Sequence, residues 1–390
     1  MKNRVADRID KLGSESAFSI MARANQLEAK GMNVIHLEIG QPDFKTPQNI
    51  IDAAGKALND GHTGYTPTAG IVPLREAIAR HCREYKKVDA DMENVVVVPG
   101  GKPVMFFTLL MLAQQGDEVI YPDPGFPIYE SVINFSGAKP VPMPLLEKND
   151  FRIDLDRLKR DINDRTRLII INNPSNPTGG TLSADDIKAI ADLVRDKDIY
   201  ILSDEIYDRI IFDGQPLSIA SLPGMKDRTI ILDGFSKAYA MTGWRLGYGV
   251  MNRELAEHMA LLMCNSNSCT AAMTQWAGVE ALEGPQDAVD KMVAAFKERR
   301  DYLIGALNDI DGINCVKPSG AFYAFPNISS FGLGCADFAD RLLEEAGVAA
   351  AWGTAFGKYG EGFMRMSYAN SLENLKIAVD RIDKFTKTLK

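Results

Sequence analysis

The chain is poor in the residues that metal and redox sites require. Its 390 residues include four histidines and five cysteines, namely His36, His62, His81, His258, Cys82, Cys264, Cys269, Cys315 and Cys335. No C-x-x-C pair and no H-E-x-x-H spacing occurs among them. We therefore expect reduced thiols, no metal site and no histidine-centred mechanism.

Long apolar runs and an excess of positive charge are also missing. No stretch approaches the roughly 20 apolar residues that span a bilayer. The N-terminus, MKNRVADRIDKLGSES, mixes charges of both signs and has no apolar stretch, unlike a signal peptide. The formal net charge of −8 disfavours nucleic acid and anionic membranes as partners. These features predict a cytoplasmic globular protein.

The order of apolar and helical segments predicts an α/β fold. Short apolar strands alternate with helices of 10–15 residues, which is typical of a mostly parallel sheet covered on both faces. The expected strands are Val95–Val98, Asp117–Tyr121, Leu168–Ile171, Ile199–Leu202, Thr229–Leu232 and Leu246–Val250. We expect a three-layer large domain over residues 46–290, and a smaller α+β domain formed by 1–45 together with 291–390.

The segment Asp233–Gly247, DGFSKAYAMTGWRLG, carries the strongest chemical signal. Lys237 leaves a buried strand at a tight turn, where burial favours the neutral, nucleophilic amine. Ser236 precedes it, and Arg245 follows after a short loop; both suit a phosphate. The segment indicates an aldehyde cofactor that carries a phosphate and is bound covalently to Lys237.

Three other strand ends carry residues with two possible roles each. Gly101 and Lys102, in PGGKP, could bind an anion at a helix start or form a plain turn. Asn176, in NPSNPTG, sits in a loop that two prolines stiffen, so it could hold a ligand or belong to a rigid surface turn. Asp204, in SDEIY, could pair with a protonated ring nitrogen, with Tyr207 nearby, or cap a helix.

Three further residues are ambiguous when each is taken alone. Phe126, in PDPGFPIYE, could stack on a ring or belong to the core. Tyr65, in GYTPTAG, has no distinguishing context. Arg365 lies within an otherwise apolar strand, which favours bidentate binding of a carboxylate.

Taken together, these motifs resemble the fold-type I, pyridoxal-phosphate-dependent aminotransferases of class I/II, in particular the aspartate-aminotransferase-like enzymes. The motifs IGQPD, YTPTAG, PGGK, the aromatic of PDPGF, NPSNPTG, SDEIY, SKAYAMTGWRLG and R-x-S occur in the family's order. The resemblance runs from about Phe18 to the C-terminus. Eight weak motifs in one order make a specific signal.

The resemblance implies a role for each matching residue. Lys237 would form the Schiff base with pyridoxal 5'-phosphate and later carry the proton, while Asp204 would keep the pyridine nitrogen protonated. Asn176 and Tyr207 would hydrogen-bond to the ring hydroxyl. Other cofactor contacts would come from Gly101, Lys102, Phe126, Ser236 and Arg245, and from Tyr65 of the other subunit of a homodimer. Arg365 would bind the substrate α-carboxylate, with Gly40 and Asn176 close by.

The implied reaction is ping-pong transfer of an amino group between an L-amino acid and a 2-oxo acid, with aspartate and 2-oxoglutarate as one pair. In some aspartate enzymes a partner-subunit arginine reads the substrate side chain, but the matching place falls near Leu262, where no arginine stands. Lys102, Ser14 and Ser16 are the candidates for that role. The substrate class stays open among acidic, aromatic and small aliphatic amino acids.

Two other functions remain open. A C–S lyase or an aminocyclopropane-carboxylate-synthase-like enzyme would share both fold and cofactor, since fold does not fix function. A non-enzymatic sensor would need a DNA-binding extension, which the acidic composition and the early start of the expected domain disfavour.

Overall fold

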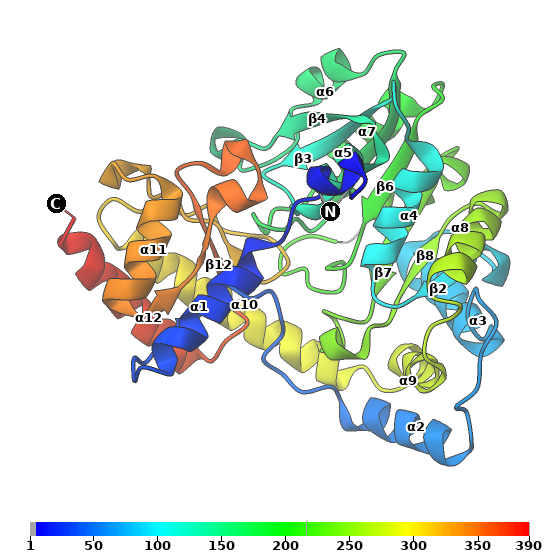
Figure 1. Cartoon of the computed structure of the whole chain (residues 1–390), viewed down its shortest axis with the longest axis horizontal. Helices are drawn as coiled ribbons and strands as arrows, with labels where there is room; N and C mark the ends of the chain where they lie inside the picture. The colour runs from blue at the N-terminus through cyan, green and yellow to red at the C-terminus, as the bar shows by residue number, and fades with distance from the viewer. Residues whose placement is uncertain (1–4, 216, 390) are drawn as a thin grey trace.

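The computed structural model describes residues 5–215 and 217–389 (Figure 1). Its larger part is built on a seven-stranded sheet with the order β2-β8-β7-β6-β5-β3-β4. The strands are β2 (Val95–Val98), β3 (Glu118–Asp123), β4 (Lys139–Pro144), β5 (Thr166–Asn172), β6 (Tyr200–Asp204), β7 (Thr229–Gly234) and β8 (Gly247–Val250). Only β8 runs antiparallel to its neighbours β2 and β7. The predicted α/β class with a mostly parallel sheet is confirmed.

Alternate residues of the strands pack on opposite faces of this sheet, which is why the strands read as continuous apolar runs. Val96 and Val98 pack toward α4 (Lys102–Leu112) and α8 (Arg253–Ser266). Val95 and Val97 pack toward α3 (Val72–His81) and α9 (Ala272–Glu283). The same alternation in β5 and β6 buries α5 (Ile128–Ser136) on one side and α7 (Ala184–Val194) on the other. The large body is therefore three layers thick.

A second group of strands and helices lies beside the large sheet (Figure 1). It contains the antiparallel sheet β11-β12-β9, with β9 (Tyr323–Ala324), β11 (Ala351–Trp352) and β12 (Met364–Ser367). It also contains the parallel pair β1 (Ile35–His36) and β10 (Val348–Ala349). Around them pack α1 (Ser16–Glu28), α10 (Asp287–Asn308), α11 (Cys335–Ala346) and α12 (Leu372–Lys387). Segments from the two ends of the chain thus share one core.

The N-terminal segment links the two groups. The 3-10 helix Asp7–Lys11 packs against α5 of the large body, and the backbone N–H of Gly13 donates to Oγ of Ser131 over 2.9 Å. The next helix, α1, packs against β10 and β11 of the smaller group. Residues 12–15 therefore cross between the groups. The domain boundaries expected at residues 45 and 290 stay a prediction.

One strand of the large sheet was not expected from the sequence, and helix α3 ends at His81 in a π-helical turn, Cys82–Lys86. β4, with the sequence KPVPMP, was not expected because proline disfavours strands; as the edge strand it has one side free of ladder bonds. Helix α6 (Leu155–Asp161) lies between β4 and β5 in the chain. Within the described ranges, no helix combines the length and apolar character needed to cross a bilayer.

Candidate active site

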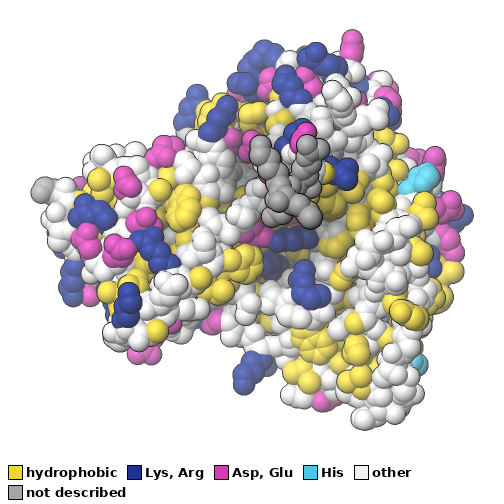
Figure 2. All heavy atoms as spheres, viewed as in Figure 1, with side chains coloured by type: hydrophobic (Ala, Val, Ile, Leu, Met, Phe, Trp, Pro, Cys, Tyr) yellow, Lys and Arg dark blue, Asp and Glu magenta, His cyan; other side chains and the backbone are white. Residues whose placement is uncertain are grey.

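A cavity of about 660 Å³ lies at the carboxyl ends of β6 and β7, between the two groups of elements. In parallel sheets, ligands bind at this edge. Most of the residues predicted from the sequence line this cavity, namely Gly40, Gly101, Lys102, Phe126, Asn176, Asp204, Tyr207, Ser236, Lys237, Arg245 and Arg365. In the view of Figure 2, Lys and Arg side chains gather near the middle of the molecule, between the two groups.

Lys237 lies three residues beyond the end of β7, half-buried in the cavity wall. Its ammonium donates to the carbonyl oxygen of Gly40 over 2.5 Å. Burial, together with the positive charge of Arg365, lowers the pKa of Lys237 to about 8, although the charge of Glu15 acts in the opposite direction. A substantial fraction of the amine is therefore neutral, and nucleophilic, near neutral pH.

Asp204 is the last residue of β6 and is buried. The hydroxyl of Tyr129 donates to its Oδ2 over 2.6 Å, and the backbone N–H of Ile206 donates to its Oδ1 over 3.3 Å. Burial raises the pKa of Asp204 to about 6, although the bond from Tyr129 acts in the opposite direction. A cation placed in the cavity would stabilise the ionised carboxylate.

Tyr207 and Asn176 reach the cavity from two loops. The hydroxyls of Tyr207 and Tyr323 lie 2.7 Å apart, and burial raises the pKa of both phenols, so both stay protonated at neutral pH. The amide oxygen of Asn176 accepts a bond of 3.2 Å from Nη1 of Arg365. The backbone N–H of Asn176 donates to Oδ1 of Asn172 over 2.8 Å, which fixes the loop against the end of β5.

Arg365 enters from β12 and is buried. Its guanidinium lies 4.7 Å from the ring centres of both Tyr323 and Phe356, and Nη2 donates to the carbonyl of Glu38. Its Nε has no hydrogen-bond partner among the described residues. Arg365 lines the cavity, where a buried, planar guanidinium is suited to a carboxylate.

The start of α4 forms an anion cradle. Gly100 has a φ of +82°, and a Cβ atom there would lie 2.1 Å from Nη2 of Arg245, so only glycine lets the guanidinium approach. Gly101 is the N-cap of α4, and no side chain caps this end of the helix, where the backbone N–H of Lys102 is the first that could bind an anion. Ser236 and Arg245 line the same part of the cavity.

The charges of the lining favour an anionic ligand. Four cations line the cavity, Lys102, Lys237, Arg245 and Arg365, against two carboxylates, Glu15 and Asp204. The excess of two positive charges, the glycine cradle and the buried carboxylate at the other end fit a flat ring that carries a phosphate and a protonated nitrogen.

Tyr65 does not line the cavity. Its side chain is 92% exposed, so no residue of the described chain covers it. The predicted role of Tyr65 at the cofactor of a partner subunit stays a prediction. Ser14 and Ser16 are also absent from the lining, whereas Glu15 between them is part of it.

Three residues that matter here were not predicted from the sequence, namely Tyr129, Tyr323 and Glu15. Tyr129 lies 75 positions before Asp204, and Tyr323 lies 116 positions after Tyr207. Tyr129 lies three residues beyond Phe126, and the two ring centres are 5.7 Å apart.

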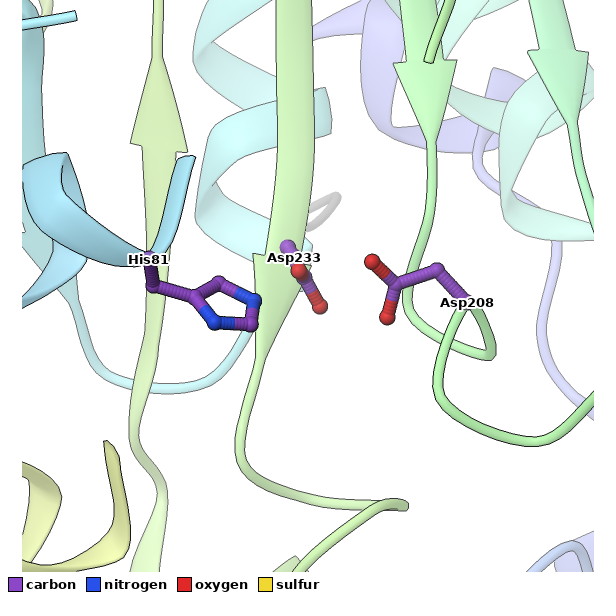
Figure 3. A group of neighbouring side chains, drawn as sticks. All are labelled: His81, Asp208 and Asp233. Carbon is purple, nitrogen blue, oxygen red and sulfur yellow. The ribbon is translucent and has the colours of Figure 1, made fainter. Parts of the chain in front are cut away.

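A second cluster of ionisable groups lies outside this lining, around the buried ammonium of Lys86. Nζ of Lys86 lies 2.9 Å from carboxylate oxygens of both Glu205 and Asp233 and also contacts Asp208. Figure 3 shows Asp208 and Asp233 with His81 turned toward them. Burial lowers the pKa of His81 to about 4, and the charge of Lys86 lowers it too, so the imidazole is neutral. Lys86 already supplies these carboxylates with a cation, so we do not propose a metal there.

Comparison with known proteins identifies the family. Residues 32–382 match the model of the family described as aminotransferase class I and II. The chain belongs to this family. It is 41% identical to an aspartate aminotransferase of Pyrococcus horikoshii over 385 residues, which cover 97% of this chain and 96% of the relative. It is 38% identical to an aromatic-amino-acid aminotransferase of Thermococcus litoralis, with 99% of each covered.

The fold of the aminotransferase agrees with solved structures. The aspartate aminotransferase of Thermus thermophilus, solved with maleate, superposes with a TM-score of 0.94 at 34% identity, covering 98% of this chain and 99% of that one. The predicted aminotransferase family, fold and transaminase class are therefore confirmed. The names of these relatives differ in substrate, so the family alone leaves the substrate open.

Proposed function

We propose that this aminotransferase uses pyridoxal 5'-phosphate to move an α-amino group between an L-amino acid and a 2-oxo acid, with aspartate and 2-oxoglutarate among its substrates. One observation carries the proposal. The half-buried amine of Lys237, with a pKa of about 8, lines the same net-positive cavity as the buried carboxylate of Asp204.

Each part of the cavity would hold one part of the cofactor. The cradle of Gly101, Lys102, Ser236 and Arg245 would bind the phosphate, with the Lys102 backbone N–H at the helix start as a donor. Phe126 would contact the ring face. Asp204 would hold the protonated ring nitrogen, and Tyr207 and Asn176 would bond to the ring hydroxyl. The bound cofactor supplies an electron sink for the bond broken at the substrate Cα.

The side chains of the protein would orient the substrate and move its proton. Arg365 would bind the α-carboxylate through its guanidinium, beside Asn176 and Gly40. Nζ of Lys237, neutral after it leaves the cofactor, would take the proton from Cα as general base. The same amine would return a proton to complete the transfer, which requires that it remain close to Gly40 and the substrate.

An acidic side chain would be recognised by Lys102. Among the lining residues of the described chain, Lys237, Arg245 and Arg365 have the roles above, so the Lys102 ammonium is the cation left for a second carboxylate. The names of two relatives as aspartate aminotransferases, one solved with maleate, support this choice.

A homodimer would complete the site. Tyr65, exposed in the single chain, would reach the phosphate in the partner subunit and add a hydrogen bond to that anion. The dimer and the role of Tyr65 belong together in this proposal, because a monomer leaves the residue without a function.

A single half-reaction tests the proposal. Protein loaded with pyridoxal 5'-phosphate is mixed with aspartate and no 2-oxo acid, and the products are quantified. We expect about one equivalent of oxaloacetate per site and no ammonia, with further turnover only after 2-oxoglutarate is added. A C–S lyase would instead release ammonia and continue without an acceptor when given a cysteine derivative. Continuous ammonia release would overturn the proposal.

A further inference from the structure

We propose that Glu15 determines substrate specificity by competing with the substrate's side-chain carboxylate for Lys102. The inference rests on the proposed function, because it deepens the role given to Lys102. It predicts that this chain discriminates less strongly in favour of acidic substrates than Lys102 alone would allow.

The ion pair between these residues is part of the cavity wall. A carboxylate oxygen of Glu15 contacts Nζ of Lys102, and both side chains line the cavity. The Glu15 side chain is 18% exposed, while that of Lys102 is 48% exposed. The same ammonium lies 5.5 Å from the ring centre of Phe126. A carboxylate therefore already occupies the position that a substrate side chain would use.

Glu15 is held in this position by the segment on either side. Before it, Gly13 is bonded to Ser131 of the large body. After it, α1 begins at Ser16 and packs on the smaller group. Glu15 is the N-cap residue of α1 but its side chain makes no capping bond, so the carboxylate is free to pair with Lys102. Because the segment is held on both sides of Glu15, the carboxylate is kept at the cavity.

Pairing with Glu15 changes what this end of the cavity selects. With Glu15 ionised, the charges of Lys102 and Glu15 cancel, and the neighbouring lining is apolar, formed by Phe18, Ile39, Met105 and Phe126. Such a surface accepts a neutral or aromatic side chain. An acidic side chain must first displace Glu15, which would then lie beside a second negative charge.

The exposure of the ion pair sets the size of the effect. A partly exposed pair is weak, so a substrate carboxylate can displace it at a small loss of affinity. We expect removal of the Glu15 charge to strengthen binding of a dicarboxylate about two- to fivefold. A ligand without the second charge gains nothing from the change.

The test uses cofactor-loaded protein and the Glu15→Gln variant. Dissociation constants of succinate and of its neutral isostere succinamate are measured by isothermal titration calorimetry. The matched control is Asp10→Asn, which removes one negative charge from the same segment at a residue that does not line the cavity. Lys102→Met and the double variant complete a cycle.

The inference requires that Glu15→Gln tighten succinate about two- to fivefold and leave succinamate unchanged, and that the gain disappear in the Lys102→Met background. An equal change for both ligands, no change, or a gain that persists without Lys102 would overturn it. The calorimetry needs no turnover. Failure of transamination would therefore count against the proposed function, whereas failure of the ligand pattern would count against the role of Glu15.

Discussion

Tyr129 donates its hydroxyl to Oδ2 of Asp204 over 2.6 Å, and both side chains are buried. The bond lowers the pKa of Asp204, against the larger effect of burial, which raises it. A hydrogen bond to a charged group contributes about 1.5–3 kcal/mol. Tyr129 is therefore a positioning residue that keeps the carboxylate ionised for a cation in the cavity.

Tyr129→Phe should weaken binding of pyridoxal 5'-phosphate about tenfold or more, because the ionised form of Asp204 loses its bond. The dissociation constant is measured by fluorescence titration of the cofactor-free protein. Tyr200→Phe, at the other end of β6, is the matched control and should leave the affinity unchanged. Equal affinities in Tyr129→Phe and wild type would contradict this role.

Asp204→Asn should abolish transamination and stabilise the cofactor-free protein. The folded-state pKa of about 6 lies above the ordinary value of 3.8, so ionised Asp204 destabilises the fold above pH 6, by about 3 kcal/mol. The penalty fades as pH falls through 6 toward 4, since the folded state then holds the proton. Urea unfolding should show a gain near 3 kcal/mol at pH 7.5 and about 1 kcal/mol at pH 4.5.

The matched control for this experiment is Asp164→Asn, an exposed residue in the turn before β5. It should leave the urea midpoint unchanged at both pH values. A gain for Asp204→Asn that is the same at pH 7.5 and pH 4.5 would mean that the pKa of Asp204 is not raised in the folded state.

The residues predicted from sequence share one property, which is a place at the end of a strand or in a short motif. Lys237 and Asp204 follow apolar strands directly, so the parallel sheet brings them to the same edge. Arg365 was recognisable because a guanidinium inside an apolar strand needs a partner. Local sequence was sufficient for these residues.

Other residues could not be found in that way. A tyrosine such as Tyr129 or Tyr323 looks like any core aromatic until folding joins segments about a hundred residues apart. Glu15 was not predicted, although the serines on either side of it were expected at the cavity. Which of these three side chains lines the cavity depends on where α1 begins. The proline-rich β4 lacked a clear periodic signal of a strand.

Lys237→Ala should lower kcat by at least about a thousandfold while the protein still binds the cofactor, because nucleophile and general base are lost together. Borohydride reduction followed by mass spectrometry should attach the cofactor to the wild type and not to the variant. The control is Lys188→Ala, on the exposed face of α7, which should retain wild-type turnover. Undiminished activity of Lys237→Ala would refute the assignment.

Tyr65 permits a test of whether each active site uses residues from both subunits, since its side chain is 92% exposed and no described residue of its own chain covers it. Tyr65→Phe should weaken the phosphate contact and lower activity about tenfold at limiting cofactor.

If Tyr65 acts across a dimer, mixing Tyr65→Phe with Lys237→Ala chains after reversible dissociation creates hybrid dimers in which one of the two active sites is intact. Random pairing should then restore about a quarter of wild-type activity. Sedimentation should show dimers, and a mixture no more active than its separate components would show that Tyr65 does not serve the partner's site.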